Sequence, residues 1–389
     1  MLRLLALLPQ VALLVLAAYN LATALPGLRR TVPAPLSTRR RRFRVVIPAH
    51  NEGRLLGDIL SDLANQHYES GLVSTWVLAD RCTDDTEAVA LGRGAQVASR
   101  EEGPDGKGAA LRWYLAAHPL GDDEALVVLD ADNRVPPALL GRFADELDAN
   151  HRALQAYVDT SNPDASWLAT ASALSYWASN RMIQQARTNL AWPADLSGTG
   201  MCLSAEALMA AGGFGSGLTE DQELTARLAL AGITPRFVPD VKVRDEKPVV
   251  VAVAVRQRAR WAAGKAQQRK TAIALLLKGL ETRSAGPLDL AVRMLQPSRT
   301  LVAGLSGVLL VMAALWPGKY LLPWPVWLGA VAVQLLAPIP FLVIERVPAR
   351  YLWRYPLLAV FALLWLPVRL IARRATGWYH TPHEGVSSR

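Results

Sequence analysis

Two aspartates one residue apart end an apolar run of this chain. The run 127–129 is followed at once by Asp130 and Asp132, with Ala131 between them. Alternate residues of a strand share one face, so a chain leaving a buried strand here can aim both carboxylates at one point. Two hard oxygen ligands suit Mg²⁺ or Mn²⁺, which such sites share with substrate phosphates. A solvated turn after a strand gives the same pattern, so the metal hypothesis depends on the surrounding polar residues.

A second pair of carboxylates, Glu220 and Asp221, stands between Thr219 and Gln222. Thr219 and Gln222 have the spacing of a capping box, which predicts the two carboxylates in the first turn of a helix. The helix dipole stabilises negative charge there and favours an exposed carboxylate that stays ionised. Capping alone therefore explains the pattern without catalysis.

Short apolar runs alternate with longer mixed segments from residue 43 to about 240. We expect strands at 44–49, 73–79, 95–99 and 125–129, and helices near 52–66, 84–91, 107–117 and 137–150. This alternation predicts a mostly parallel sheet covered by helices on both faces, with ligands bound beyond the carboxyl ends of the strands. Polar clusters follow the first, second and fourth predicted strands, at 50–52, 80–85 and 130–132. They are expected to converge on one crevice.

The composition indicates a protein that is partly embedded in a membrane. Hydrophobic residues make up 51% of the chain and the mean hydropathy is +0.17. Residues 4–28 carry no charge and are long enough to span a bilayer, and they are longer than the apolar core of a signal peptide. Six arginines and no acidic residue follow in 29–42, which places the next domain in the cytoplasm. Cys82 and Cys202 are then expected to be free thiols.

Basic residues also gather between 256 and 278, where seven Lys or Arg occur without an acidic residue. This stretch is typical of an amphipathic helix that lies at the membrane surface. The alternative is a basic segment that binds nucleic acid. The net charge of +9 does not require a nucleic acid, because much of it lies beside apolar segments where anionic lipid attracts it.

Three apolar segments follow, at 301–316, 321–344 and 355–371. A third full span would export the C-terminal tail, whereas Arg369, Arg373 and Arg374 favour a cytoplasmic one. Either one segment is re-entrant or interfacial, or the charge rule is overridden. His380 and His383 either fold back toward the site or are solvated. The expected organisation is an N-terminal transmembrane helix (1–28), a basic linker (29–42), a cytosolic domain (43–248), interface helices (249–285), a C-terminal transmembrane region (286–374) and a polar tail (375–389).

Several motifs together, in chain order, carry a resemblance to a known family. They are 46–52, 80–86, 106–108, 130–132, 219–221 and 257–261. The chain resembles the family 2 glycosyltransferases with a GT-A fold, and is most similar to the membrane-integrated branch of cellulose, chitin and hyaluronan synthases. The resemblance covers residues 43 to 261, and its specificity comes from the ordered set. It implies an α/β, Rossmann-like GT-A domain in the cytosol, joined to transmembrane and interface helices.

The resemblance also implies roles for the matching positions. Those implied to bind the nucleotide sugar are Pro48, Ala49, Asn51, Glu52, Asp80, Lys107, Asp130 and Ala131. Asp130 and Asp132 would hold the diphosphate through Mg²⁺ or Mn²⁺. Asp221 would be the general base, next to Glu220. Those implied to contact the acceptor or the diphosphate are Gly198, Thr199, Gly200, Gln257, Arg258, Arg260 and Trp261.

The function expected on this basis is inverting transfer of a sugar from a nucleotide donor, a UDP-sugar, to an acceptor hydroxyl. We expect a multi-pass protein of the cell membrane that acts as a polysaccharide synthase, with the donor, a glycan or lipid acceptor and the bilayer as its partners. One alternative is single addition to a lipid or short acceptor, since three C-terminal apolar segments are few to line a channel. Another is a non-catalytic membrane protein that binds a sugar nucleotide.

Overall fold

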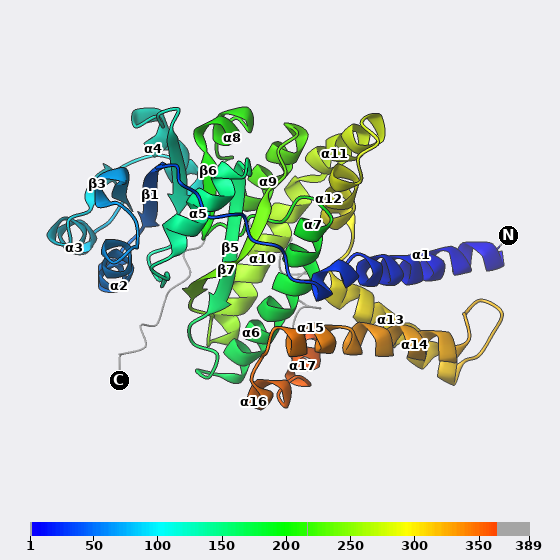
Figure 1. The fold of residues 1–389 in the computed structure, drawn as a ribbon. Helices are drawn as coiled ribbons and strands as arrows, with labels where there is room; N and C mark the ends of the chain where they lie inside the picture. The colour runs from blue at the N-terminus through cyan, green and yellow to red at the C-terminus, as the bar shows by residue number, and fades with distance from the viewer. Residues whose placement is uncertain (1, 216, 364–389) are drawn as a thin grey trace.

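A seven-stranded sheet lies at the centre of the protein (Figure 1). The computed structural model describes residues 2–215 and 217–363. The strand order is β3-β2-β1-β4-β6-β5-β7. The strands are β1 (Arg42–Ala49), β2 (Val73–Asp80), β3 (Gln96–Arg100), β4 (Glu124–Val128), β5 (Ala153–Thr160), β6 (Met201–Ser204) and β7 (Arg236–Asp245). β6 runs antiparallel to β4 and β5, and the other neighbouring strands pair in parallel. The predicted, mostly parallel sheet is confirmed.

The four predicted strands and four predicted helices of the first half are present, with ends shifted by a few residues. The helices are α2 (Gly53–Ala64), α3 (Thr86–Gly92), α4 (Lys107–Ala117) and α5 (Leu139–Asp148). Side chains of β1 are buried on both faces: Val45 packs in one core with Leu56 and Phe143, and Val46 in the other with Leu111. Burial on both faces explains why these strands are continuous apolar runs.

The second half adds further helices around the sheet. They are α6 (Trp167–Ser179), a π-helical turn η3 (Asn180–Gln185), α7 (Ala186–Asn189), α8 (Ala205–Ala210), α9 (Glu220–Leu230), α10 (Val251–Gln267), α11 (Arg269–Glu281) and α12 (Ala285–Leu295). The predicted basic stretch is therefore helical, in α10 and α11. α9 packs against both α11 and α12.

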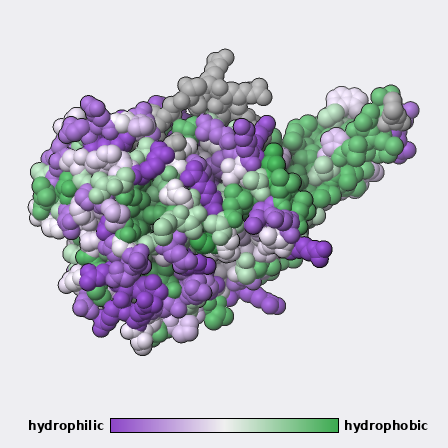
Figure 2. All heavy atoms as spheres, turned by 90° about the horizontal axis from the view of Figure 1, so that it is seen from above, coloured by the Kyte–Doolittle hydropathy of each residue, from purple (hydrophilic) through white to green (hydrophobic). Residues whose placement is uncertain are grey.

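Three apolar helices project from the body and contact one another (Figure 1). They are α1 (Leu2–Ala22), which leads into η1 (Leu25–Leu28), α13 (Arg299–Leu315) and α14 (Trp324–Leu336). We call this group the apolar arm; Figure 2 shows its hydrophobic surface. Within the described residues, Leu2–Leu28 and Trp324–Ile344 are long and apolar enough to cross a membrane, and a third candidate arises if α12 and α13, bent by 61°, form one span.

After the arm, the chain returns to the body through α15 (Pro338–Ile344), α16 (Ala349–Leu352) and α17 (Leu357–Leu363). Phe361 is buried with Leu168 of α6 and Ala254 of α10. The described part of the third predicted apolar segment thus packs on the domain, which fits the interfacial alternative. Residues 364–371, which include Arg369, and the following Arg373, Arg374 and tail with His380 and His383 lie outside the described residues.

Candidate active site

A cavity of about 620 Å³ lies beyond the carboxyl ends of β1, β2 and β4. Most of the predicted site residues line it: Pro48, Ala49, Glu52, Asp80, Lys107, Asp130, Asp132, Gly198, Thr199, Glu220, Asp221, Gln257, Arg258, Arg260 and Trp261. The expectation that the polar clusters converge is confirmed. Asn51, Ala131 and Gly200 are not among the lining residues.

Each of these three has another place in the fold. Asn51 adopts a left-handed backbone conformation (φ 57°), and its side-chain oxygen accepts a hydrogen bond from the Thr83 backbone N–H at 2.7 Å. The Ala131 side chain is 1% exposed and belongs to the core. A Cβ at Gly200 would lie 3.1 Å from Cγ2 of Val243, so this glycine permits close packing against the sheet. Contact of these three residues with a ligand stays a prediction.

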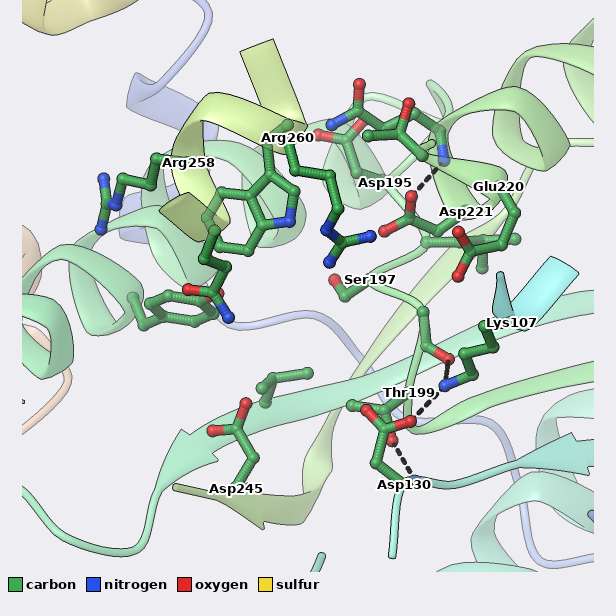
Figure 3. A pocket seen from close by; sticks show the side chains of 18 of the residues that line it. Lys107, Asp130, Asp195, Ser197, Thr199, Glu220, Asp221, Asp245, Arg258 and Arg260 are labelled. Atoms are coloured by element: carbon green, nitrogen blue, oxygen red, sulfur yellow. Dashed lines mark hydrogen bonds and ion pairs between the residues drawn. The ribbon is translucent and has the colours of Figure 1, made fainter. Parts of the chain in front are cut away.

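The loop after β4 is held by buried polar groups. The Asp130 backbone N–H donates to Oδ1 of Asn133 at 2.9 Å and to Oγ1 of Thr199 at 3.1 Å. Thr199 also donates to Asn133, and Gln155 donates to the Thr199 carbonyl at 2.9 Å. Thr199 therefore fixes the position of Asp130 (Figure 3). Sequence reasoning missed Asn133 and Gln155, because a single amide carries no periodic signal.

Lys107 lies between Asp130 and the pair Glu220 and Asp221 (Figure 3). Its Nζ bonds to Asp130 and donates to the Gly198 carbonyl at 2.9 Å. A Cβ at Gly108 would lie 2.8 Å from Cβ of Glu220, so this glycine lets α4 approach the start of α9. Burial lowers the pKa of Lys107, but the charges of Asp130, Glu220 and Asp221 outweigh burial and the pKa is raised. Lys107 is thus a cation at the centre of the cavity.

Glu220 and Asp221 begin α9, as predicted, but the capping box and the exposed, ionised carboxylate are wrong. The Thr219 side chain does not cap the helix; its hydroxyl accepts a hydrogen bond from Nε2 of Gln268 at 2.8 Å. Gln268, between α10 and α11, is this competing partner; Glu220 is 8% exposed and Asp221 is partly buried. Burial, together with the charge of Glu220, raises the pKa of Asp221 to about 7. A carboxyl group that titrates near neutrality is suited to proton transfer.

A third carboxylate joins the aspartate pair from the end of β7. Burial and the charges of Asp130 and Asp245 raise the pKa of Asp132 to about 8. Asp245 forms an ion pair with Nζ of Lys247 at 2.6 Å. Asp245 follows the rule that a polar residue ends a strand. Sequence reasoning missed it because the alternating polar residues of β7 concealed the strand itself.

The aspartates suit a divalent cation. Among the described residues, no group of three or more His, Cys, Asp or Glu forms a ready-made metal site. Two protein carboxylates with further oxygens from phosphate and water is the usual arrangement for Mg²⁺. Burial, together with the charges of Asp130 and Asp245, raises the pKa of Asp132, and a cation bound beside it would favour the ionised carboxylate. The donor set fits the ion that the sequence predicted.

A buried ion pair joins the ends of β2 and β3. Asp80 is 6% exposed and accepts hydrogen bonds from Arg100 at 2.9 Å and from Arg81 at 3.1 Å. The His50 ring nitrogen Nδ1 lies 2.6 Å from the Asp80 carbonyl. These contacts hold the polar side chains of His50 and Asp80 in place at one end of the cavity.

The two arginines of the 257–261 motif point in different directions (Figure 3). Arg260 enters the cavity, and its Nη1 donates to the Leu218 carbonyl at 3.1 Å. Arg258 points away from Asp221 and stacks over Phe361, with 4.4 Å between its guanidinium carbon and the ring centre. Trp261 also lines the cavity. One helical turn thus presents a cation and an aromatic ring to the same space.

The family model described as "Glycosyltransferase like family 2" matches residues 40–264, more than half of the chain. The chain belongs to glycosyltransferase family 2. It is 28% identical over 251 residues to a beta-monoglucosyldiacylglycerol synthase from Nostoc sp., covering 60% of this chain and 51% of that protein. It is 30% identical over 257 residues to the Synechocystis sp. protein of the same name, covering 62% and 50%. The chain spans about half the length of these curated relatives.

The fold resembles that of a mannosyltransferase from Pyrobaculum calidifontis, solved in complex with GDP-Man and Mn²⁺. The TM-score is 0.62 and the identity 21%, and the similarity covers 93% of this chain and 99% of that one. The GT-A fold of this family 2 member is therefore supported by both sequence and structure. The finer placement beside cellulose, chitin and hyaluronan synthases stays a prediction, because the Nostoc and Synechocystis relatives both carry the name of a lipid glycosyltransferase.

Proposed function

We propose that this family 2 glycosyltransferase transfers a single sugar from a nucleotide donor to a hydroxyl group of a membrane lipid, with inversion. One observation carries the proposal. A single cavity reaches from Asp80 and Asp130 at the strand ends, past Asp221, to α12 and the start of α13. The donor end therefore lies in the α/β domain, and the acceptor end lies at the base of the apolar arm.

The donor end would bind a sugar nucleotide, a UDP-sugar by family resemblance. Asp130 and Asp132 would hold a divalent ion, and the Mn²⁺ in the Pyrobaculum complex supports this choice. When bound, such an ion stabilises the negative charge of a departing diphosphate. Lys107 and Arg260 add positive charge of their own in the same cavity, where electrostatic stabilisation is stronger than in water.

In the proposed reaction, Asp221 removes the proton from the acceptor hydroxyl. The hydroxyl oxygen then forms a bond to the anomeric carbon as the bond from that carbon to the diphosphate oxygen breaks. The nucleoside diphosphate leaves with the electron pair, and the configuration at the anomeric carbon inverts. Gly198 is suited to the space between donor and base, because a Cβ there would lie 3.7 Å from Oδ2 of Asp221. A side chain at this position would occupy part of the acceptor space.

A lipid acceptor is favoured over a growing polysaccharide. The named relatives are beta-monoglucosyldiacylglycerol synthases. The apolar arm of the described residues consists of α1, α13 and α14. Three helices give little surface to enclose a polymer. The second candidate, a polysaccharide synthase, is favoured by Gln257, Arg260 and Trp261, which all line the cavity.

The proposed location is the cell membrane, with the α/β domain in the cytoplasm. The arm exposes large apolar side chains along its length, including Leu5, Leu8 and Val308. A continuous exposed apolar surface marks a membrane or protein contact. The arginine-rich segment 29–42 follows α1 and favours a cytoplasmic domain.

The experiment is nucleotide release by the detergent-purified protein, offered UDP-, GDP- and dTDP-sugars with Mg²⁺ or Mn²⁺ and diacylglycerol or a native lipid extract. We expect release from one donor that depends on both metal and lipid. Release that needs an oligosaccharide acceptor instead would favour the polysaccharide synthase. Binding of a donor without release under any of these conditions would favour the non-catalytic alternative.

A further inference from the structure

The acceptor end of the cavity is basic. It is lined by Lys265 of α10, Arg293 of α12 and Arg299 at the start of α13. None of these three takes part in the donor binding or the proton transfer proposed above. We call this group the basic end of the cavity.

The buried charges around the basic end do not balance. Arg187 and Asp289, both nearly inaccessible, form an ion pair at 3.0 Å. Arg293 pairs with Asp289 at 2.8 Å and also bonds to Asp195. Two carboxylates are thus shared by two arginines.

Arg299 is the third arginine of this cluster. The charges that act on it are those of the same four residues, Arg187, Arg293, Asp289 and Asp195. Within residues 2–215 and 217–363, Arg299 forms no hydrogen bond or ion pair of its own. Three cations face two anions, so one positive charge remains, and Arg299 carries it into the cavity.

The position of Arg299 in its helix strengthens this point. α13 begins at Arg299 and is capped by Ser298, whose Oγ accepts a hydrogen bond from the Leu301 N–H at 3.3 Å. Helix N-termini favour anions, so a cation there is unfavourable for the helix itself. An anion bound between Arg299 and the first-turn N–H groups would offset the charge of Arg299 and accept hydrogen bonds from the N–H groups. The planar guanidinium is well matched to phosphate oxygens.

We propose that the basic end of the cavity binds a phosphate group of the acceptor, and that the acceptor is therefore an anionic phospholipid with a free hydroxyl. The inference rests on the proposed function. α13 continues from Arg299 into the apolar arm, so a lipid whose chains lie along the arm would bring its headgroup to this point. Neutral diacylglycerol, the lipid part of the product for which the relatives are named, offers no phosphate to Arg299.

The test compares two acceptors with the same acyl chains, dioleoylphosphatidylglycerol and dioleoylglycerol, in phosphatidylcholine vesicles. The neutral lipid is also assayed with an equal fraction of phosphatidylserine, which gives the vesicle the same surface charge. For the wild type we expect kcat/KM to be about tenfold or more higher for the phosphate-bearing acceptor. Equal values for both acceptors would overturn the inference and leave the proposed function intact.

The variant is Arg299→Gln, with Arg299→Lys to retain the charge and Arg269→Gln as the matched control. Arg269 is exposed on the neighbouring helix α11 and lies outside the cavity. We expect Arg299→Gln to raise the KM for phosphatidylglycerol about tenfold, with kcat and the KM for the donor unchanged, and Arg299→Lys to recover part of the loss. Arg269→Gln should behave as the wild type.

Three further results would contradict the assignment. A parallel rise in KM for both lipids, together with weaker cosedimentation of Arg299→Gln with vesicles, would show that Arg299 only anchors the protein to the membrane. A rise in the KM for the donor would place the diphosphate of the donor at this end. If inorganic phosphate competed for the basic end as well as phosphatidylglycerol does, the ligand would be a soluble anion instead of a lipid. Transfer to neither lipid, but to a glycan, would overturn the proposed function itself.

Discussion

The pH dependence of transfer should report on Asp221. Burial and the charge of Glu220 raise its pKa to about 7, and a general base must be deprotonated to act. Half of the molecules carry the ionised base at about pH 7, so activity is nearly complete at about pH 8 and is lost as the pH falls through 7. At pH 6 about one-tenth of the molecules carry the ionised base, so kcat/KM should fall roughly tenfold between pH 7.5 and pH 6.

Asp221→Asn removes the base and keeps the size of the side chain. A positioned general base contributes about 10²- to 10⁴-fold, so transfer should fall by this factor while donor binding is retained. The residual rate should also lose the rise between pH 6 and pH 7.5. Asp123→Asn is the control, because Asp123 is 69% exposed and its closest basic group, Arg42, is 3.4 Å away.

The assay is lipid-dependent nucleotide release from pH 5.5 to 8.5, with donor affinity measured separately by titration. A wild-type profile that is flat between pH 6 and 8 would refute the assignment of Asp221 as the base. So would an Asp221→Asn variant that keeps either near-normal turnover or the same pH dependence.

Three other perturbations test the architecture of the site. Gly108→Ala should destabilise the fold by about 1–3 kcal/mol and impair transfer, because the added Cβ meets Cβ of Glu220 at 2.8 Å. The control is Gly141→Ala: its added Cβ has no neighbour within 4 Å, so the melting temperature should stay unchanged or rise. Because the pKa of Asp132 is raised from 3.8 to about 8, its contribution to stability is complete below pH 4 and is lost as the pH rises through 8. In EDTA, the wild type should therefore lose more thermal stability between pH 6 and 8.5 than Asp132→Asn does, and equal losses would contradict this. EDTA should stop nucleotide release and Mn²⁺ restore it, and release that persists in EDTA would exclude the metal.

The strands and the strand-end clusters could be predicted because their signal is local. Val45, Val46 and Ile47 are buried on alternating faces of β1, and only a strand covered by helices on both sides explains a continuous apolar run. The carboxyl ends of parallel strands meet at one edge, so Glu52, Asp80 and Asp130 had to lie near one another.

The remaining features depend on contacts between distant residues. Thr219 has a capping sequence, but Gln268, 49 positions away, takes its hydroxyl. Gln155 is buried in β5 and holds the loop at Thr199 through a bond that no periodicity predicts. Asn51 follows its strand like a ligand-binding residue, yet its amide holds the Thr83 turn. In each case tertiary packing decides between two local possibilities.

The central claim is that one sugar is transferred from a nucleotide donor to a lipid in this cavity. The most direct measurement is the mass of the product formed over time by the purified protein in vesicles of native lipid, compared with the product of Asp221→Asn. We predict one product, a lipid that carries a single added sugar, whose amount but not mass increases with time and which Asp221→Asn does not form. A ladder of products that lengthens with time, or the same product from Asp221→Asn, would contradict the account.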